Sequence, residues 1–351
     1  MADAGEVTAD YEQWLGRQIP LDETELALKH RELAQDEYRF LRGTYYLWLV
    51  RAAAEMPDAF AHTPVPLVGD LHVENYGTWR DHDQIRRWGV NDLDELARGS
   101  WLLDLVRLAV SAVLAPHVVL DDHEICDTVL AAWSAASPGA AVDLREAPHL
   151  APLVPAFADS AAFYAGLADG SPVDDVPAKV VAAAERVAEP GWTPSWHVHE
   201  AGTGSLGHRR RVGVGQATDR SWHAREVKEL GPPSCVWAAT RVSAVEVPRA
   251  EEEAYDVVAT AVRGPAGATR VEGWQVRDLA PDVVRIRPDG RHHHEARRLL
   301  EAMAQGAADV HGADSAALRG AQGESISEGD FRSRVAVMTQ AVRADHRRWR
   351  G

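Results

Sequence analysis

Two short runs between residues 69 and 95 hold the side chains best suited to catalysis. The first reads Gly69-Asp70-Leu71-His72-Val73-Glu74-Asn75, and the second reads Asn91-Asp92-Leu93-Asp94-Glu95. An Asp followed five positions later by an Asn, with another Asp less than twenty residues beyond, matches the way kinase-type phosphotransferases space a base and two metal ligands. We therefore expect Asp70 to orient or deprotonate an acceptor, and Asn75 and Asp92 to hold Mg²⁺.

A glycine-rich run, Gly202-x-Gly204-x-x-Gly207, is the second chemical feature of the chain. The residues that follow it, 208–213, read as a strand instead of a helix, which favours a flap over nucleotide phosphates and argues against a dinucleotide-binding turn. Lys228 lies one predicted strand later, 21 residues past Gly207, where a kinase places the Lys that holds the α- and β-phosphates. Gly202, Gly204, Gly207 and Lys228 are thus the predicted ATP-binding residues.

Each feature also has a purely structural interpretation. Asp70 and Asn75 would cap a turn through side chain to backbone hydrogen bonds, and Asp92 with Asp94 would form a solvated acidic turn. The glycines would make a flexible hairpin and Lys228 would be a solvated strand residue. The agreement of several partly independent features favours the nucleotide site. The run His292-His293-His294 instead predicts an exposed helix start, because consecutive residues cannot easily direct three imidazoles at one ion.

Composition limits the class of protein. The 351 residues carry a formal net charge of −16, so the overall field repels phosphate backbones and anionic membrane surfaces, and neither nucleic acid nor a membrane is an expected partner. ATP would need local neutralisation by Mg²⁺ and a few placed cations. The two cysteines, Cys126 and Cys235, stand far apart with no metal-binding spacing and are expected to be reduced, buried and inert. The N-terminus lacks a secretory pattern, and the apolar stretch 101–120 is broken by charges and a proline, so we expect a cytoplasmic location.

Element signals divide the chain into a helical first part and a strand-rich second part. Helical periodicity marks residues 8–56, and short strands near 65–68 and 87–90 each end at one of the acidic runs. The segment Trp101 to Leu114 reads as a buried helix with one narrow polar stripe, Asp104, Arg107 and Ser111. Extended runs from 196 to 230 indicate an antiparallel meander, and helices are predicted near 124–137, 178–187, 251–262, 295–311 and 328–349. We expect a helical lobe at 1–190, a small β lobe at 196–280 and C-terminal helices at 281–351 that return to the helical lobe.

These motifs resemble those of a bacterial family called domain of unknown function 2252. The resemblance rests on the two acidic runs, Phe40-Leu41-Arg42-Gly43, Trp101 to Leu108, the glycine run, Val227-Lys228-Glu229 and Ala308 to His311, and it covers nearly the whole chain. It implies membership of the protein-kinase-like superfamily. The Gly-Asp-Leu-His-x-x-Asn run is also similar to the catalytic loop of aminoglycoside and choline phosphotransferases. The implied fold class is α+β, a bilobal kinase-like fold in circularly permuted order, because the catalytic and metal motifs here precede the glycine run and the Lys.

Two departures from the family pattern bear on the site. Val68 replaces the His of aminoglycoside phosphotransferases, so one packing contact of the loop must be made differently. The acidic partner of Lys228 is not fixed by the sequence: Glu252, Glu253 and Asp256 are the candidates, with Glu253 favoured.

The resulting expectation is an ATP- and Mg²⁺-dependent phosphotransferase that acts on a small acceptor, with His72 and Asp94 supporting the ligands. A non-catalytic nucleotide-binding module with the same fold is the second hypothesis. A third is a dinuclear metallohydrolase built from Asp70, His72, Asp92 and Asp94. The acceptor, the oligomeric state and the choice between phosphoryl and nucleotidyl transfer stay open.

Overall fold

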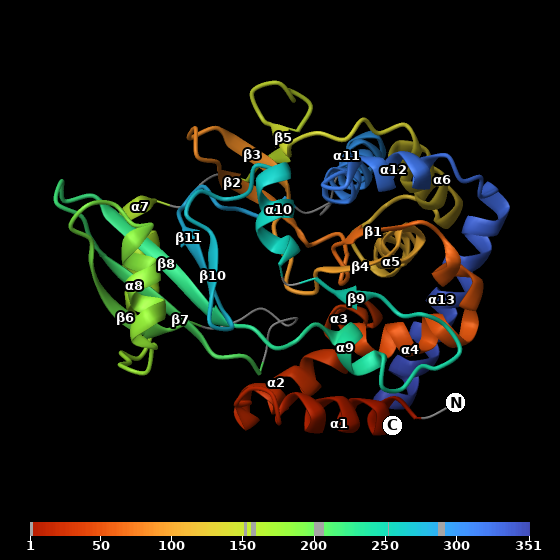
Figure 1. The fold of residues 1–351 in the computed structure, drawn as a ribbon, viewed down its shortest axis with the longest axis horizontal. Coiled ribbons are helices and arrows are strands. Elements are labelled where there is room, and N and C mark those ends of the chain that lie inside the picture. Colours follow the sequence, from red (N-terminus) through yellow and green to blue (C-terminus); the bar gives the residue numbers. More distant parts are fainter. Residues whose placement is uncertain (1–2, 151–152, 156–158, 200–206, 252, 287–291) are drawn as a thin grey trace.

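The computed structural model describes residues 3–150, 153–155, 159–199, 207–251, 253–286 and 292–351. It has a mixed α+β architecture, in which helices surround short strands on one side and a larger antiparallel sheet lies on the other (Figure 1). The α+β class predicted from the sequence is confirmed.

The described residues form the following helices: α1 (Ala4–Leu15), α2 (Glu23–Leu33), α3 (Glu37–Gly43), α4 (Tyr45–Glu55), the 3-10 helix η1 (Pro57–Ala61), α5 (Trp101–Leu114), α6 (Asp122–Ser134), α7 (Ser160–Ala168), α8 (Ala178–Arg186), α9 (Ser234–Ala238), α10 (Ala254–Ala261), α11 (His293–His311), α12 (Ser315–Gln322) and α13 (Glu328–Trp349). Their strands are β1 (Pro64–Leu67), β2 (Tyr76–Arg80), β3 (Arg86–Val90), β4 (Ala97–Ser100), β5 (Val142–Asp143), β6 (Thr193–Val198), β7 (Arg210–Gln216), β8 (Trp222–Glu229), β9 (Arg249–Ala250), β10 (Thr269–Val271) and β11 (Trp274–Leu279).

Helix α5 is the centre of the main core. Every residue but one of its fourteen is buried, and it contacts α3, α6, α11 and α13. Trp101 at its first turn stacks on Trp133 of α6 with ring centroids 4.4 Å apart. The bounds predicted for α5 and α13 match the structure, and both are long apolar-faced segments with clear breaks.

The strands of two small sheets flank each acidic run, one strand before the run and one after it. Strand β1 pairs with β4, Leu67 opposite Ala97, and β2 pairs with β3, Tyr76 opposite Val90. The first run connects β1 to β2, and the second connects β3 to β4. Since β1 pairs with β4 and β2 pairs with β3, the two runs lie side by side.

The third sheet has five antiparallel strands in the order β10-β11-β8-β7-β6. The predicted meander is confirmed by the pairing of β6 with β7 and of β7 with β8. Alternate residues face opposite sides: Val227 and Val276 pack with Val180 of α8, whereas Val212 and Ala224 pack with Tyr164 of α7. Both helices precede residue 196, the predicted start of the β lobe, in the sequence. They nevertheless pack on the five-stranded sheet.

Several minor predictions are also tested. His292, His293 and His294 are exposed at the start of α11, as expected. Cys126 and Cys235 are free and buried, and burial raises the pKa of each thiol to about 12, which suits an inert thiol. None of the described helices is both long and apolar enough to cross a membrane.

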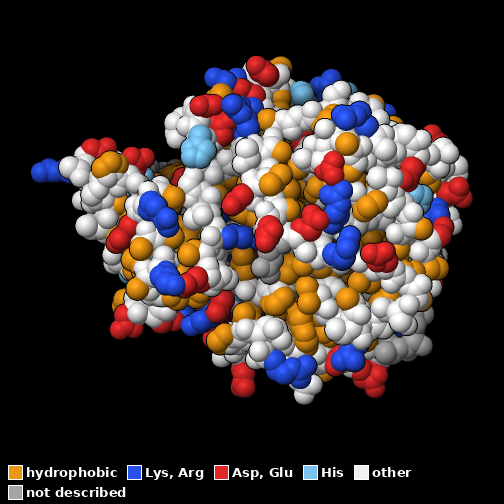
Figure 2. Space-filling model, viewed as in Figure 1, with side chains coloured by type: hydrophobic (Ala, Val, Ile, Leu, Met, Phe, Trp, Pro, Cys, Tyr) orange, Lys and Arg blue, Asp and Glu red, His pale blue; other side chains and the backbone are white. Residues whose placement is uncertain are grey.

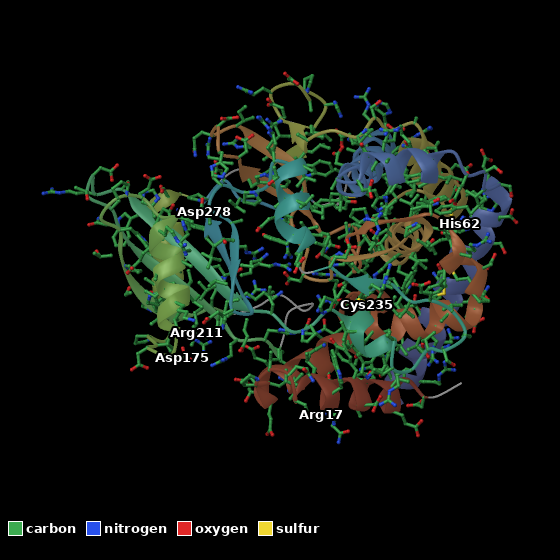
Figure 3. All side chains as sticks on the ribbon, in the orientation of Figure 1. Arg17, His62, Asp175, Arg211, Cys235 and Asp278 are labelled. Carbon is green, nitrogen blue, oxygen red and sulfur yellow. The ribbon has the colours of Figure 1, made fainter. Side chains whose placement is uncertain are left out.

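Charges on the visible surface are mixed. Figure 2 shows Lys and Arg side chains scattered among acidic ones over the whole face. Local ion pairs account for some of this, such as Arg211 with Asp175, 2.6 Å apart beside the five-stranded sheet (Figure 3).

Asp309 of α11 makes stability depend on pH. Its side chain is 4% exposed, and burial raises the pKa of this carboxyl to about 7. The folded protein therefore retains a proton that the unfolded chain loses near pH 4, and stability falls as the pH rises from about 4 to about 7. We predict that Asp309→Asn, which keeps an oxygen to accept from Gly139 and Gln305, raises the free energy of unfolding by about 2 kcal/mol at pH 8.

Urea unfolding at pH 5 and pH 8 measures this difference. The variant should show a flatter pH dependence than the wild type. An equal pH dependence in both proteins would show that Asp309 ionises normally in the fold.

Candidate functional site

The first acidic run forms a tight loop after β1. Gly69 has a φ of +87°, and a Cβ atom at this position would lie 2.4 Å from the backbone oxygen of Glu95. The loop closes on itself, because the His72 amide donates to Asn75 Oδ1 at 2.6 Å. Only glycine allows both this backbone conformation and this contact with the second run.

The polar stripe of α5 fixes this loop from below. Asp104 accepts hydrogen bonds from the amides of Val68 at 2.7 Å and Gly69 at 3.1 Å, and Ser111 Oγ accepts from the Val73 amide at 3.1 Å. Arg107 donates to Asp70 Oδ1 through Nε at 3.0 Å. The three polar residues of an otherwise apolar helix therefore each hold a different point of the loop.

His311 supports the same arrangement from α11. Its Nδ1 accepts from Trp133 Nε1 at 3.0 Å and its Nε2 lies 3.2 Å from Asp104 Oδ2. The ring is fully buried and has a partner at each nitrogen, so its place in the core is satisfied.

Asp70 is held on one oxygen only. Both hydrogen bonds from Arg107 end on Oδ1, and the Asp70 side chain is 21% exposed, so the second oxygen is the one that can face a ligand. Burial raises the pKa of Asp70, and the Arg107 charge works in the opposite direction. Arg107 is itself buried against the rings of Tyr45 and Trp48, 4.8 and 5.3 Å from the two centroids.

The β2–β3 hairpin brings Asn75 to Asp92. Asn75 precedes β2 and Asn91 follows β3, and the Asn91 amide donates to the Asn75 carbonyl at 2.9 Å, which extends the ladder by one pair. Asp92 is the next residue, and its Oδ1 accepts from the Asp94 amide at 3.3 Å. The predicted metal ligands thus lie at the same end of one hairpin.

The five-stranded sheet supplies the opposite wall. Alternation places Arg210, Glu226, Lys228 and Arg277 on one face, because Arg210 pairs with Lys228 and Arg277 pairs with Glu226 in the register. Glu226 is 1% exposed and lies 2.8 Å from Arg210 and 2.5 Å from Arg277. Although burial opposes ionisation, these two arginines lower the pKa of Glu226 to about 2, so it anchors both cations.

Lys228 forms an ion pair with Asp94, 134 positions earlier in the chain. Despite burial, Lys228 holds the pKa of Asp94 well below its usual range. The sequence had placed this partner in the segment 252–256 instead. Glu252 lies outside the described residues, Glu253 caps α10 without a side-chain cap bond, and Asp94, expected only as a supporting residue, takes the role.

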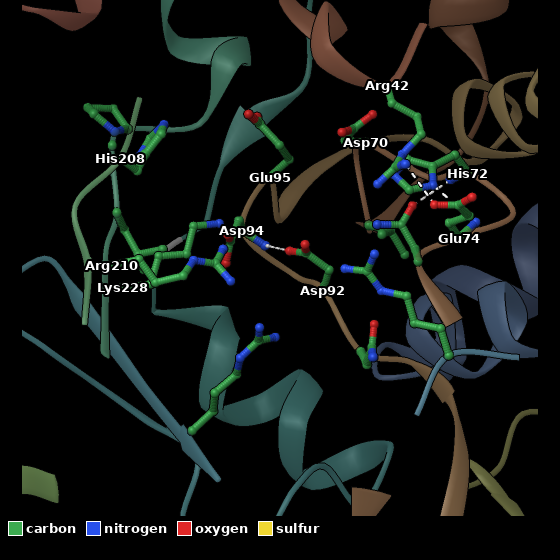
Figure 4. Close-up of a pocket in the computed structure, with 18 of the residues that line it drawn as sticks. Arg42, Asp70, His72, Glu74, Asp92, Asp94, Glu95, His208, Arg210 and Lys228 are labelled. Atoms are coloured by element: carbon green, nitrogen blue, oxygen red, sulfur yellow. Dashed lines mark hydrogen bonds and ion pairs between the residues drawn. The ribbon is translucent and has the colours of Figure 1, made fainter. Parts of the chain in front are cut away.

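These groups line one cavity between the sheet and the helical part of the molecule (Figure 4). Its lining balances five cations against five carboxyls: Arg42, Arg210, Lys228, Arg277 and Arg285 against Asp70, Glu74, Asp92, Asp94 and Glu95. In a chain with a net charge of −16, this is the local neutralisation that an anionic ligand needs.

The structure brings Asp70, Asn75, Asp92 and Lys228 together at this cavity. Gly207 is not part of the lining, and its amide donates to Glu25 of α2 at 2.9 Å. Gly202 and Gly204 lie outside the described residues. The arginines of the cavity were not predicted, because a single arginine on a predicted strand gives no sign of a site until the strand register is known. The polar stripe of α5 was predicted, but its contacts with the loop after β1 were not.

Glu95 is a further titratable group of the cavity. Its carboxylate accepts from the Ser234 amide at 2.6 Å and from Ser234 Oγ at 2.7 Å. Burial, with a contribution from the charge of Asp70, raises the pKa of Glu95 to about 7. A carboxyl that is half protonated near neutral pH so close to Asp70 is typical of a functional site.

Among the residues that the structure describes, no group of three or more His, Cys, Asp or Glu side chains is placed to hold a metal ion. The dinuclear metallohydrolase hypothesis therefore has no support in the geometry. His72 also has Nδ1 engaged by the Glu74 amide at 3.1 Å.

Comparison with known proteins identifies one similarity. Residues 21–135 match the model of a family described as "Uncharacterized protein conserved in bacteria (DUF2252)". This confirms the resemblance inferred from the sequence for the part of the chain that carries both acidic runs and α5. No curated protein and no solved structure matches the chain.

The contact between the two runs gives a first test of the site. We predict that Gly69→Ala lowers the free energy of unfolding by about 2–4 kcal/mol, because the new methyl group meets the Glu95 carbonyl and the backbone is strained. Gly166 in α7 has open space around its Cβ position, so Gly166→Ala should be neutral or stabilise by about 0.5 kcal/mol. Urea unfolding of both variants measures the contrast, and equal effects would contradict it.

The α5 stripe gives a second test. Asp104→Asn presents an amide donor to loop amides that are also donors, so a loss of about 2–4 kcal/mol is expected. Asp127→Asn on α6 removes a half-exposed pair with Arg332 and should cost at most about 1 kcal/mol. If the two variants unfold at the same urea concentration, the stripe is not what holds the loop.

Proposed function

We propose that the protein is an ATP- and Mg²⁺-dependent phosphotransferase that acts on a small-molecule acceptor. The observation that carries the proposal is the convergence of Asp70, Asn75, Asp92 and Lys228 on one cavity. The acidic loops and the lysine strand come from distant parts of the chain, and each residue has the type that kinase chemistry needs.

The five-stranded sheet adds support. The glycine run lies between β6 and β7, and Lys228 lies on β8, the third strand of the sheet in chain order, as in the kinase arrangement of glycine loop and lysine strand. The acidic runs precede this sheet in sequence, so the fold would be a circularly permuted one.

The metal ligands suit Mg²⁺ better than a transition metal. Mg²⁺ is bound by one or two protein oxygens together with water and substrate phosphates, which fits a site of Asn75 and Asp92 alone. Asn75 Oδ1 already accepts the His72 amide but has a second lone pair. The ion would neutralise charge that develops on the phosphates.

Asp70 would act on the acceptor. Its free oxygen takes the proton of the acceptor hydroxyl or amine, while the acceptor lone pair forms a bond to the γ-phosphorus of ATP. The bond from that phosphorus to the β,γ-bridging oxygen breaks, and its electron pair leaves with ADP. The raised pKa of Asp70, caused by burial, suits a general base better than an ordinary aspartate would.

Lys228 and Arg210 would steady the phosphates from the sheet side. Lys228 has three donors and lines the cavity, where one of them would bind a phosphate oxygen. Glu226 holds Arg210 in place from beneath.

A non-catalytic nucleotide-binding module is the second candidate. The observation that favours it is the pairing of Asp70 with the buried Arg107, because a carboxylate that accepts two hydrogen bonds from a guanidinium is a weaker base. Nucleotide binding is common to both candidates, and turnover separates them.

Asp70→Asn separates them directly. The amide oxygen can still accept from Arg107, but the buried guanidinium loses its counterion, so the variant should unfold more easily than the wild type. It should keep its thermal stabilisation by MgADP while ATP consumption falls about 10²–10⁴-fold. Lys228→Met should instead weaken MgADP binding. Asp174→Asn, at an exposed position, is the matched control and should change neither.

The measurements are thermal unfolding with and without MgADP, and ADP release over a panel of small hydroxyl and amine acceptors. A wild-type protein that binds MgADP but releases no ADP with any acceptor would favour the non-catalytic candidate. A protein that MgADP does not stabilise would contradict both.

A further inference from the structure

The cavity has two ends. His208, Arg210 and Lys228 lie at one end, Arg42, His72 and Glu74 lie at the other, and Asp92 and Asp94 lie between them (Figure 4). The first end belongs to the nucleotide in the proposed function. The second end lies beyond Asp70 and has no role there.

Arg285 is the additional cation of this second end. Its backbone forms a bridge with Gly77 of β2, two residues after Asn75, and its exposed side chain lines the cavity. Desolvation lowers the pKa of Arg285 and the charge of Arg42 acts in the same direction, while Asp92 and Glu74 oppose the shift. In the described part of the chain, no hydrogen bond or ion pair engages its guanidinium.

Hydrogen-bond donors outnumber acceptors at this end. Arg42 uses Nη1 on Glu74 at 2.7 Å, while its Nε is buried without a partner among the described residues. His72 accepts the Glu74 amide on Nδ1, so the ring proton lies on Nε2 and offers one more donor.

We infer that the Arg42–Arg285 end binds an oxyanion, and that the acceptor is a small molecule that carries a phosphate ester or a carboxylate besides its reacting hydroxyl or amine. The substrate assignment and the treatment of the Asp92 charge rest on the proposed function, whereas the arginine donors of the oxyanion site do not. Guanidinium groups bind carboxylate and phosphate through paired hydrogen bonds. A cationic acceptor would meet two arginines, and a neutral one would leave them unpaired.

The charge of Asp92 does not cancel this preference. In the proposed function Asp92 is a metal ligand, so its negative charge is shared with the cation and is not available to Arg285. Glu74 forms an ion pair with Arg42. Arg42 and Arg285 both line the cavity, on the far side of Asp70 from the nucleotide, where an acceptor must lie for transfer in line.

Binding of inorganic phosphate and of malonate tests the site without any turnover. Both are titrated by calorimetry at constant ionic strength, in the presence of saturating MgADP, into the wild type and into Arg285→Gln and Arg17→Gln. Arg17 is exposed on the surface near α1 (Figure 3) and controls for the loss of one positive charge.

We expect Arg285→Gln to weaken the preferred anion at least tenfold, while Arg17→Gln binds it as the wild type does. Preference for phosphate indicates a phosphate ester on the acceptor, and preference for malonate indicates a carboxylate. Anion binding that is absent, or equal in the wild type and Arg285→Gln, overturns the inference.

Two outcomes distinguish this inference from the proposed function. If Arg285→Gln loses MgADP binding together with the anion, Arg285 belongs to the nucleotide site and the inference is wrong while the proposed function stands. If MgADP binds to no variant, including the wild type, the proposed function is wrong, and the same titrations without nucleotide still decide whether the oxyanion site exists.

Discussion

The site depends on one buried contact, between the polar stripe of α5 and the loop that follows β1. A carboxylate as deeply buried as Asp104 is tolerated only when its oxygens accept hydrogen bonds, and here its partners are two loop amides and His311. The constraint acts in both directions. The loop needs Asp104 because its amides would otherwise be buried unpaired, and α5 needs the loop because Arg107, with no exposed surface, finds its counterion in Asp70.

The second acidic run then joins the two halves of the cavity. Asp94 pairs with Lys228 of the sheet, and the next residue, Glu95, accepts two hydrogen bonds from Ser234 in the segment that leaves the sheet. The backbone of Glu95 also touches Gly69. The second acidic run therefore contacts the loop after β1, the five-stranded sheet and the segment that leaves the sheet. A shift of the sheet would displace this run and, through it, the loop that carries Asp70.

Sequence reasoning could predict the local parts of this arrangement and not the distant ones. The fold class, helices such as α5 and α13, and the clustering of Asp70, Asn75 and Asp92 follow from periodicity and from motif spacing within one hairpin. The Lys228–Asp94 pair and the arginines of the sheet face depend on strand register and on how the sheet meets the helical part. Those are set by the packing of α7 and α8 on the two faces, for which one sequence gives no spacing rule. Short elements such as β2, β4 and α9 were missed for the same reason, because tertiary pairing stabilises them more than propensity does.

The charge of the cavity lining is balanced, whereas the chain as a whole is strongly negative. A chain with a net charge of −16 repels free anions at long range, but that repulsion is screened over about 8–10 Å at physiological salt, whereas the paired groups inside the cavity are screened far less. Glu226 fixes Arg210 and Arg277, and Glu74 fixes Arg42, so these cations are held in place before a ligand arrives. An anionic ligand is therefore bound by preorganised donors, and a ligand whose charge is partly neutralised by a metal meets the least resistance on the way in. Glu95, with a pKa near 7, adds a negative charge only above neutral pH, so the balance inside the cavity shifts toward the cations as the pH falls.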